Sequence, residues 1–540
     1  MIFIKKYYII YIQNKEINKF PLVQEEAMRK RRMYMNTFMN GLKAANNFIR
    51  TENGAIAHRT TQSDLLDMFA LGGAYRNRTD DDVKILFRNA YTENSVYALK
   101  CLFYLRDVRG GQGERRFFRV AMKDLAYWDT DAARRNLVHI PEYGRWDDLY
   151  IFVGTPLEKA AMKFMKDQLE LDVQCKTPSL LAKWMKSENT SSEESRRLGN
   201  ITRRYMGMNH KQYRKTLSIL RARINVLERL MSENRWDEIE FDKIPSKAGL
   251  KYKNAFARHD VERARAGAQT YADFAKDMTK SVNAAVLNPV DIADQIFQCS
   301  YYRSPSETNR LMWQKYWDNL KDYYNGAEAG DLAIVDVSGS MSGQPMNAAV
   351  SMGAYMAERC KGPFKDHFVT FSSNPALVRF EGVDIYDKFQ RARQADWGGS
   401  TNIEATFDML LKVALKNHVP EKDMPKTLYI FSDMEFNACM CSGPVNPGRW
   451  NYSGNRVSNA HEVNTLLESI AQKWAAYGYE LPRVVFWNLD ARQNNIPAMG
   501  GRFSYVSGFS MNMVEQILSG KDGYDLMMEK LDTERYKAIK

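Results

Sequence analysis

The sequence predicts a multidomain protein with an all-α helical-repeat region followed by a doubly wound α/β domain. The length of 540 residues is more than one hydrophobic core usually organises. Apolar residues recur at helical spacing in residues 36–329, whereas short apolar strands alternate with helices in residues 330–540. Residues 1–35 are β-prone and then strongly charged, and we expect a flexible arm or an upstream extension there.

The helical prediction rests on apolar spacing and on proline positions. Residues 65–71 place Leu, Met and Phe on one helix face, and Pro141 and Pro178 fall at helix boundaries. Five apolar residues spaced along 217–230 predict one long helix. No exact repeat is visible, but helix pairs of degenerate sequence are typical of HEAT-like solenoids, and we expect such an array with almost no strand.

The α/β prediction rests on five apolar segments and the helical patterns between them. The expected strands are 332–337, 368–371, 428–431, 484–488 and 503–506. The expected helices are 346–359, 403–413, 462–477 and 512–518. Alternation of this kind is typical of a doubly wound layer with a mostly parallel sheet.

Small oxygen-bearing side chains follow two of these strands. Asp336, Ser338 and Ser340 come after the first strand, Asp433 ends the third, and Thr401 lies between a glycine turn and a helix. Ligands in open α/β sheets bind at the carboxyl ends of strands, so we expect these five residues to meet. Their hard oxygen atoms favour Mg²⁺ or another divalent cation.

The five residues, as Asp-x-Ser-x-Ser followed by Thr and Asp, resemble the metal-ion-dependent adhesion site of von Willebrand factor A domains. The resemblance implies that the serines and the threonine contact the metal, and that the aspartates act directly or through water. It also implies an open coordination position for an acidic group of a partner. The alternative is a structural loop with polar caps.

Charge is distributed unevenly along the chain. The net charge of +12 divides into 55 basic and 41 acidic residues before Asp331, and 22 basic and 24 acidic residues from Asp331 onward. A basic excess confined to one region predicts a polyanion partner there, with nucleic acid as the default. A solvated basic surface is the alternative.

The basic residues of the helical region form three clusters, and tyrosines among them offer rings for base stacking. Some of these residues are expected to be solvated helix faces or internal ion pairs instead. The candidate RNA-binding residues are Arg106, Arg109, Arg115, Arg116, Arg119, Arg203, Arg204, Lys211, Arg214, Lys215, Lys247 and Lys251, and the interleaved tyrosines are Tyr205, Tyr213 and Tyr252.

Several short sequence segments of the helical region resemble the TROVE module of Ro ribonucleoproteins, and more closely an uncharacterised domain family related to it. They are Thr51-Glu52-Asn53-Gly54, the arginine-rich loop 106–115, the segment 141–149, Ala182-Lys183-Trp184, Tyr213-Arg214-Lys215 and Pro245-Ser246-Lys247-Ala248. The resemblance extends from residue 36 to the C-terminus. It implies a ring of helical repeats joined to an A domain, with single-stranded RNA ends inside the ring and structured RNA on its basic outer face.

Other classes of protein are disfavoured. No segment approaches the roughly 20 apolar residues of a membrane span, and six scattered cysteines are typical of a reducing compartment, so we expect a cytoplasmic protein. No nucleophile–base pair, Walker loop or zinc motif is visible, which predicts a protein that is not an enzyme. Cys439, Cys441 and His461 lack a fourth ligand, and we expect no zinc there.

The sequence is therefore interpreted as a non-enzymatic, Ro-like RNA-binding protein with a Mg²⁺-dependent adhesion-type site. The alternative is a protein–protein interaction scaffold that uses the metal site without RNA. The two hypotheses differ in their salt dependence, because phosphate contacts weaken steeply with salt. A carboxylate bridged by a metal would instead be lost with EDTA.

Overall fold

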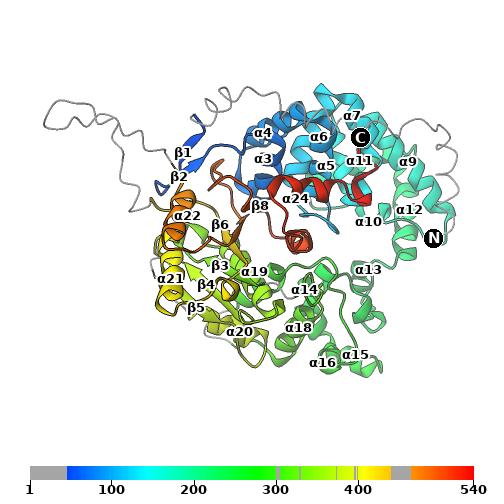
Figure 1. Ribbon diagram of the computed structural model, residues 1–540. Coiled ribbons are helices and arrows are strands. Elements are labelled where there is room, and N and C mark those ends of the chain that lie inside the picture. Colours follow the sequence, from blue (N-terminus) through cyan, green and yellow to red (C-terminus); the bar gives the residue numbers. More distant parts are fainter. Residues whose placement is uncertain are drawn as a thin grey trace. The chain divides into compact units, whose positions relative to one another are not determined.

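The computed structural model describes residues 46–299, 304–327, 330–371, 374–394, 397, 399–438 and 464–540 (Figure 1). The predicted arm at residues 1–35 and the cysteines and histidine of the zinc prediction, Cys439, Cys441 and His461, lie outside these residues. The described residues from Arg50 to Lys540 form one compact unit by their contacts.

The predicted helix-rich region is confirmed. Its α-helices are α3 (Asp64–Leu71), α4 (Asp80–Glu93), α5 (Ser95–Arg106), α6 (Arg116–Trp128), α7 (Thr130–Leu137), α8 (Ile140–Tyr143), α9 (Glu158–Gln174), α10 (Leu181–Trp184), α11 (Glu193–Tyr205), α12 (His210–Arg223), α13 (Leu227–Ser232), α14 (Ser246–Arg258), α15 (Asp260–Arg265), α16 (Tyr271–Lys276), α17 (Pro289–Phe297) and α18 (Glu307–Asp318). Two short strands, β1 (Phe48–Arg50) and β2 (Ile56–His58), precede them and were not predicted.

Local sequence explains where these helices begin. At the start of α4, the Thr79 hydroxyl accepts from the Asp82 N–H at 3.1 Å, and the Asp82 carboxylate accepts from the Thr79 N–H at 3.1 Å. This reciprocal cap satisfies two N–H groups that the helix itself leaves unpaired. Helices adjacent in sequence then pack on each other, as α3 does on α4 and α4 on α5. The HEAT-like assignment of these helices stays a prediction.

One helix prediction is wrong. The five spaced apolar residues from Leu217 to Leu230 do not lie on one long helix, because α12 ends at Arg223 and α13 begins at Leu227. Between them Asn225 has φ of 48°, a left-handed conformation that asparagine tolerates better than most residues. Leu217 and Leu230 are both buried, so the apolar stripe is the core side of two consecutive helices.

The C-terminal region contains a six-stranded mixed sheet, as its alternating pattern predicts. The strands are β3 (Asp331–Asp336), β4 (His367–Phe371), β5 (Ala376–Arg379), β6 (Thr427–Ser432), β7 (Arg483–Asn488) and β8 (Phe503–Ser507). They lie in the order β5-β4-β3-β6-β7-β8, and all neighbours are parallel except β4 and β5. Five strands agree with the predicted segments to within a residue or two, and β5 was missed.

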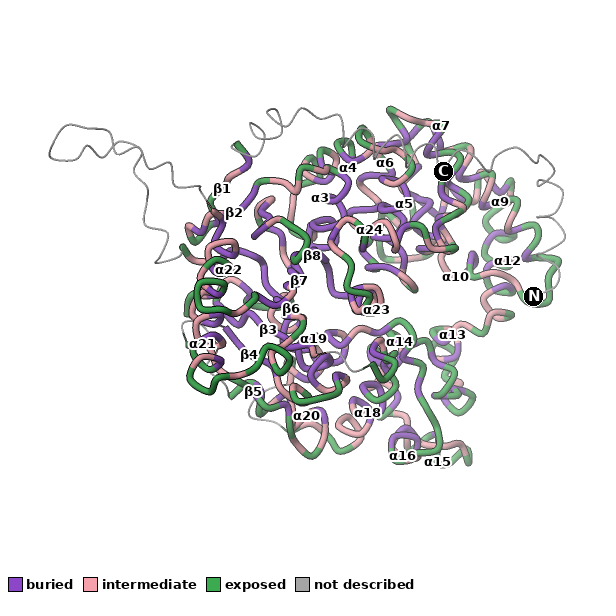
Figure 2. The backbone as a smooth tube through the Cα atoms, in the orientation of Figure 1, coloured by how far each residue is buried: buried purple, intermediate pink, exposed green. Residues whose placement is uncertain are grey.

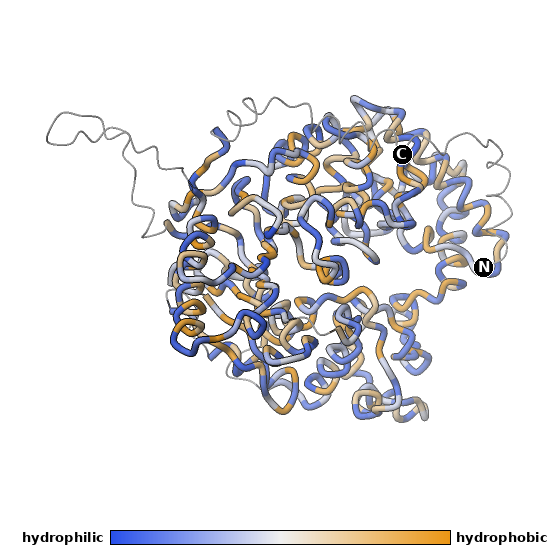
Figure 3. The backbone as a smooth tube through the Cα atoms, viewed as in Figure 1, coloured by the Kyte–Doolittle hydropathy of each residue, from blue (hydrophilic) through white to orange (hydrophobic). Residues whose placement is uncertain are grey.

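Helices accompany this sheet: α19 (Gln344–Arg359), α20 (Ile385–Ala392), α21 (Ile403–Lys416), α22 (Leu466–Ala476), α23 (Val514–Ile517) and α24 (Gly523–Leu531). Every residue of β3 is buried, and α19 packs against it closely. A Cβ on Gly353 of α19 would lie 2.4 Å from Val335 Cγ2, which explains the glycine. Figure 2 shows the central strands of the sheet buried and the outer turns of α21 exposed. Figure 3 shows the hydrophobic and hydrophilic stretches that alternate along the helices.

The helical region contacts the α/β region at both of its ends. At its start, α3 packs on β8, and the Gly73 N–H donates to Ser507 Oγ at 2.9 Å. At its end, α17 packs on α19, and Asn347 Nδ2 donates to Asp294 Oδ1 at 2.8 Å. Residues after β8 also fold back onto the first helices, where the Tyr536 ring stacks on Tyr143 with 5.7 Å between ring centroids.

Candidate functional site

The first candidate site lies where β3 and β6 end. These two strands are neighbours at the centre of the sheet, and the chain order along the sheet reverses between them. A reversal of this kind opens a crevice at the carboxyl ends of the strands, where ligands of α/β sheets bind. Asp336 is the last residue of β3, and Asp433 directly follows β6.

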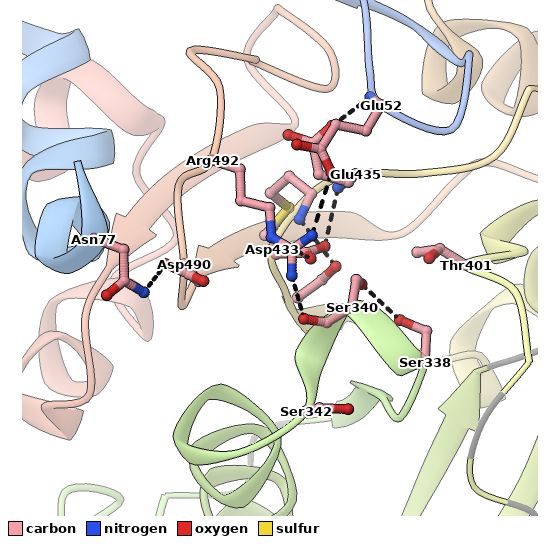
Figure 4. Close-up of polar contacts among 12 residues, drawn as sticks. Glu52, Asn77, Ser338, Ser340, Ser342, Thr401, Asp433, Glu435, Asp490 and Arg492 are labelled. Atoms are coloured by element: carbon pink, nitrogen blue, oxygen red, sulfur yellow. Dashed lines mark hydrogen bonds and ion pairs between the residues drawn. The ribbon is translucent and has the colours of Figure 1, made fainter. Parts of the chain in front are cut away.

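The residues after β3 present hydroxyl groups to this crevice (Figure 4). The Ser338 N–H donates to Asp336 Oδ1 at 3.0 Å, which turns the chain sharply after the strand. Ser338 Oγ and Ser340 Oγ then lie 3.1 Å apart. The second oxygen of Asp336 accepts from Ser432 Oγ at 2.5 Å, so β3 and β6 are joined beneath the site.

Thr401 reaches the site from the loop before α21. The side chain of Asn402 caps this helix by accepting from the Ala405 N–H at 3.1 Å. Thr401 is buried, its carbonyl accepts from the Asn437 N–H at 2.9 Å, and its Oγ1 accepts from Asn53 Nδ2 at 3.4 Å. The threonine therefore lies beside the turn that follows Asp433.

The two aspartates of this site are buried close to each other. Burial, together with the nearby charge of Asp433, raises the pKa of Asp336 to about 7. Burial also raises the pKa of Asp433, whose Oδ2 is buried and accepts no hydrogen bond from the described residues. Two buried carboxylates with hydroxyl groups beside them form a hard oxygen donor set that fits Mg²⁺ or a similar ion.

Sequence reasoning missed two charged residues here. Arg492, which follows β7, donates from Nη2 to the Ser340 carbonyl, and its Nε lies 3.8 Å from Asp433 Oδ2. Glu435 is buried and accepts from the Glu52 N–H at 2.7 Å and from Asn495 Nδ2 at 2.9 Å, and burial raises its pKa to about 7. No spacing pattern marks either residue, because tertiary contacts alone bring them to the site.

The segment Thr51–Gly54 covers this edge of the sheet. Thr51 Oγ1 donates to the Phe436 carbonyl at 2.6 Å, and Asn53 Nδ2 donates to the Glu435 carbonyl at 2.6 Å. Glu52 Oε2 accepts from Arg492 Nη1 at 3.2 Å. In the sequence this segment stood out only for its resemblance to the TROVE module, and nothing there placed it beside the candidate metal ligands.

The second candidate site is a cavity of about 1700 Å³ that we call the basic cavity. Side chains from both the helical and the α/β regions line it. Its basic residues are Arg76, Arg106, Arg109, Arg115, Arg116, Arg119, Arg145, Lys183, Arg214, Arg221, Arg229, Lys247 and Lys251, and its acidic residues are Glu114, Glu188, Glu228, Glu233 and Asp291. Thirteen basic against five acidic residues make its lining strongly positive.

Ion pairing reduces this positive excess without removing it. Every acidic residue of the lining has a basic partner, and Arg106, Arg116, Arg119 and Arg145 pair with carboxylates outside the lining. The five pairs are Glu114–Arg76, Glu188–Arg203, Glu228–Lys183, Glu233–Arg229 and Asp291–Lys247. Five basic residues of the lining have no carboxylate within 4.0 Å among the described residues: Arg109, Arg115, Arg214, Arg221 and Lys251. Their charge is left to attract an anion.

Comparison with known proteins identifies a family for the chain. Residues 51–168 and 170–325 match the model described as Domain of unknown function (DUF2828), and residues 331–538 match Domain of unknown function (DUF7788). The chain belongs to the DUF2828 family. It is 31% identical over 512 residues to "Uncharacterized protein L728" of Acanthamoeba polyphaga mimivirus, covering 87% of this chain and 85% of the relative.

Among solved structures, the crystal structure of the Deinococcus radiodurans RO (RSR) protein is similar at a TM-score of 0.44 and 15% identity. The similarity covers 88% of this chain and 100% of that chain. Among the residues that the structure describes, no helix combines the length and the apolar character needed to span a membrane.

The DUF2828 region carries all twelve candidate RNA-binding residues, and the basic cavity brings eight of them together. Those eight are Arg106, Arg109, Arg115, Arg116, Arg119, Arg214, Lys247 and Lys251. Arg203, Arg204, Lys211 and Lys215 do not line the cavity. Within the eight, the guanidinium of Arg106 is buried against Asp148 at 2.7 Å and is committed to that internal ion pair.

Aromatic side chains also line the cavity. The Arg145 guanidinium lies 4.2 Å from the Trp184 ring centroid, and the Lys251 ammonium lies 4.9 Å from that of Tyr252. Tyr213 is buried and donates to the Lys186 carbonyl at 2.8 Å, so it supports the helices beneath. Tyr205 does not line the cavity and donates to Glu158 at 2.8 Å.

Proposed function

We propose that the DUF2828 region binds single-stranded RNA in the basic cavity and that the chain is not an enzyme. The observation that carries this proposal is the cavity lining, in which all five acidic residues are paired and five basic residues have no carboxylate partner among the described residues. A partly enclosed surface with uncompensated positive charge favours a polyanion, because each phosphate that is neutralised releases a counterion. The resemblance to the TROVE module makes RNA the preferred polyanion.

The mixture of cations and aromatic rings favours a single strand. Proteins that bind unpaired strands combine a positive groove for the phosphates with aromatic side chains on which bases stack. Trp184 and Tyr252 supply such rings beside Lys183, Arg145 and Lys251. In a duplex the bases are already stacked on each other, so these rings would gain little from it.

Binding is tested with a fluorescent single-stranded oligoribonucleotide and anisotropy across a series of salt concentrations. The test variant replaces Arg115, Arg214 and Lys251 with alanine, three exposed cavity residues without carboxylate partners in the described part of the chain. The matched control replaces Arg204, Lys211 and Lys215, three exposed cations that do not line the cavity.

Each phosphate that the variant no longer neutralises should flatten the salt slope by about 0.7, so the cavity variant should show a slope smaller by up to about 2. The control should bind like the wild type. Equal weakening in both variants would assign the binding to general surface charge. If the wild-type protein shows no salt-sensitive RNA binding, the RNA proposal is wrong. The alternative, a protein–protein interaction scaffold, would then be preferred.

We also propose that Asp336, Ser338, Ser340, Thr401 and Asp433 hold Mg²⁺ or another divalent cation. The supporting observation is the buried Oδ2 of Asp433, which accepts no hydrogen bond from the described residues and lies beside a second buried carboxylate and two hydroxyl groups. Isothermal titration should show Mg²⁺ binding that Asp336→Ala abolishes. EDTA should leave RNA binding unchanged, since none of the five residues lines the basic cavity.

A further inference from the structure

We infer that Glu52 of the same chain supplies the acidic group for this metal site, so that the ion ties the segment Thr51–Gly54 to the α/β region. The inference rests on the proposed metal site and adds a ligand to it. The ion would then have a structural role, and an external protein would not be needed to complete its coordination.

Hydrogen bonds attach the segment Thr51–Gly54 to the edge of the site. Three consecutive residues contact the turn after Asp433: Thr51 bonds the Phe436 carbonyl, the Glu52 N–H bonds Glu435 Oε2, and Asn53 bonds the Glu435 carbonyl. Asn53 also donates to Thr401 Oγ1, a proposed ligand atom, at 3.4 Å. The backbone of Glu52 is therefore held at the edge of the site before any metal enters.

The Glu52 carboxylate lies on the same guanidinium as Asp433. One guanidinium, that of Arg492, bonds Glu52 Oε2 at 3.2 Å and the Ser340 carbonyl, and lies 3.8 Å from Asp433 Oδ2 (Figure 4). Glu52 and Asp433 thus face the same cation from two sides. A metal ion that binds Asp433 would meet the Glu52 carboxylate at the site's open side, where 43% of the Glu52 side chain is exposed.

The carboxylates described at this site outnumber the cations that pair with them. Asp336 and Asp433 are buried carboxylates, and Glu435 and Glu52 lie beside them. Among the described residues, Arg492 is the single cation that pairs with Asp433 or Glu52. A divalent cation would compensate the buried pair better than one guanidinium held 3.8 Å from Asp433. Arg492 is 35% exposed, so its side chain has room to move toward solvent when a metal takes its place. The arginine and the metal therefore compete for the same carboxylates.

Mn²⁺ serves as the probe, because its binding and its bound waters are both measurable. Four proteins are compared by titration and by water proton relaxation: wild type, Glu52→Gln, Arg492→Met and Asp490→Asn. Asp490 is the matched control, since its carboxylate is nearby but accepts from Asn77 Nδ2 at 3.1 Å. Near-ultraviolet circular dichroism checks that each variant keeps the wild-type fold.

Removal of an outer-shell partner already costs about 10–100-fold in metal affinity, so Glu52→Gln should weaken Mn²⁺ binding at least about 10-fold. It should also raise the number of Mn²⁺-bound waters, and added acetate should restore affinity. Arg492→Met should bind Mn²⁺ more tightly than the wild type. Asp490→Asn should change affinity little and leave the bound waters unchanged.

If Glu52→Gln has the wild-type Mn²⁺ affinity and the wild-type number of bound waters, the inference about Glu52 is wrong. The proposed metal site would still be supported by Mn²⁺ binding to the wild type. Equal weakening in Glu52→Gln and Asp490→Asn, with no gain of water, would also overturn it, because general electrostatics would then explain the effect. If Asp336→Ala binds Mn²⁺ like the wild type, the proposed metal site itself fails.

Discussion

Asp148 should be the most sensitive charged residue of the helical region. It is fully buried and accepts from Arg106 Nε at 2.9 Å, from Arg119 Nε at 2.7 Å and from the Arg145 N–H at 2.9 Å. Arg106 is itself only 1% exposed. Asp148→Ala would leave that guanidinium buried without its carboxylate.

The expected loss follows from the cost of an uncompensated buried charge. Breaking a buried ion pair by removing one partner costs about 3–5 kcal/mol of unfolding free energy. Arg106→Met should cost less, because Asp148 keeps Arg119, which is 31% exposed, as a partner. The double variant should lose less than the two single losses added together, since it leaves neither charge unpaired.

The effect should also depend on pH. Burial alone would raise the pKa of Asp148, but Arg106 and Arg119 together hold it below its usual value of 3.8. The stabilising contribution of the carboxylate is therefore present above pH 3.8 and is lost as the pH falls through the lower pKa of the folded state. The difference between wild type and Asp148→Ala should shrink in that acidic range.

Urea unfolding followed by tryptophan fluorescence measures these losses. Asp167→Ala is the matched control, because Asp167 pairs with Lys163 on an exposed helix face and such surface pairs contribute little. The reasoning is refuted if Asp148→Ala is no less stable than Asp167→Ala. Additive losses in the double variant would likewise show that Arg106 and Asp148 do not stabilise each other.

Three further predictions concern packing and the metal site. Gly111→Ala should lower the melting temperature, because its Cβ would lie 1.9 Å from a carbonyl oxygen of α5, whereas Gly501→Ala meets nothing within 4 Å and should not. Tyr536→Ala should cost about 3–5 kcal/mol in urea unfolding as a buried aromatic, against little for the exposed Tyr477→Ala. Thr401→Ala should weaken Mg²⁺ binding in isothermal titration without changing RNA binding, and equal loss of both would contradict the separation of the two sites.

The sheet was largely predictable because its central strands are continuous apolar segments. β3, β6 and β7 are buried almost throughout, which only a run of apolar residues allows. β5 was missed because it is an edge strand with a mixed pattern, and its Leu377 is exposed. The break at Asn225 was missed because the apolar spacing continues across it, and one left-handed residue leaves no periodic signal.

The two candidate sites differed in what the sequence could predict. Residues at strand ends, such as Asp336 and Asp433, lie close together because the sheet topology requires it. Arg492 and Glu52 are 440 positions apart, and no local pattern reports that they form an ion pair. The arginine clusters predicted a basic surface, but only the fold distinguishes Arg106, which is paired internally, from Arg115, which has no carboxylate partner among the described residues.

The return of the chain onto its first helices has a consequence for synthesis on the ribosome. Asp107, at the end of α5, pairs with Arg535 and accepts from the Tyr536 hydroxyl at 3.0 Å, and 428 positions separate Asp107 from Arg535. At about 5–20 residues per second, α5 is made roughly 20–90 seconds before the partners that cover it. During that interval α4 and α6 can already pack on α5, and only the part of α5 that the C-terminal segment covers stays exposed. The contacts of the C-terminal residues with Asp107 are therefore among the last to form during synthesis.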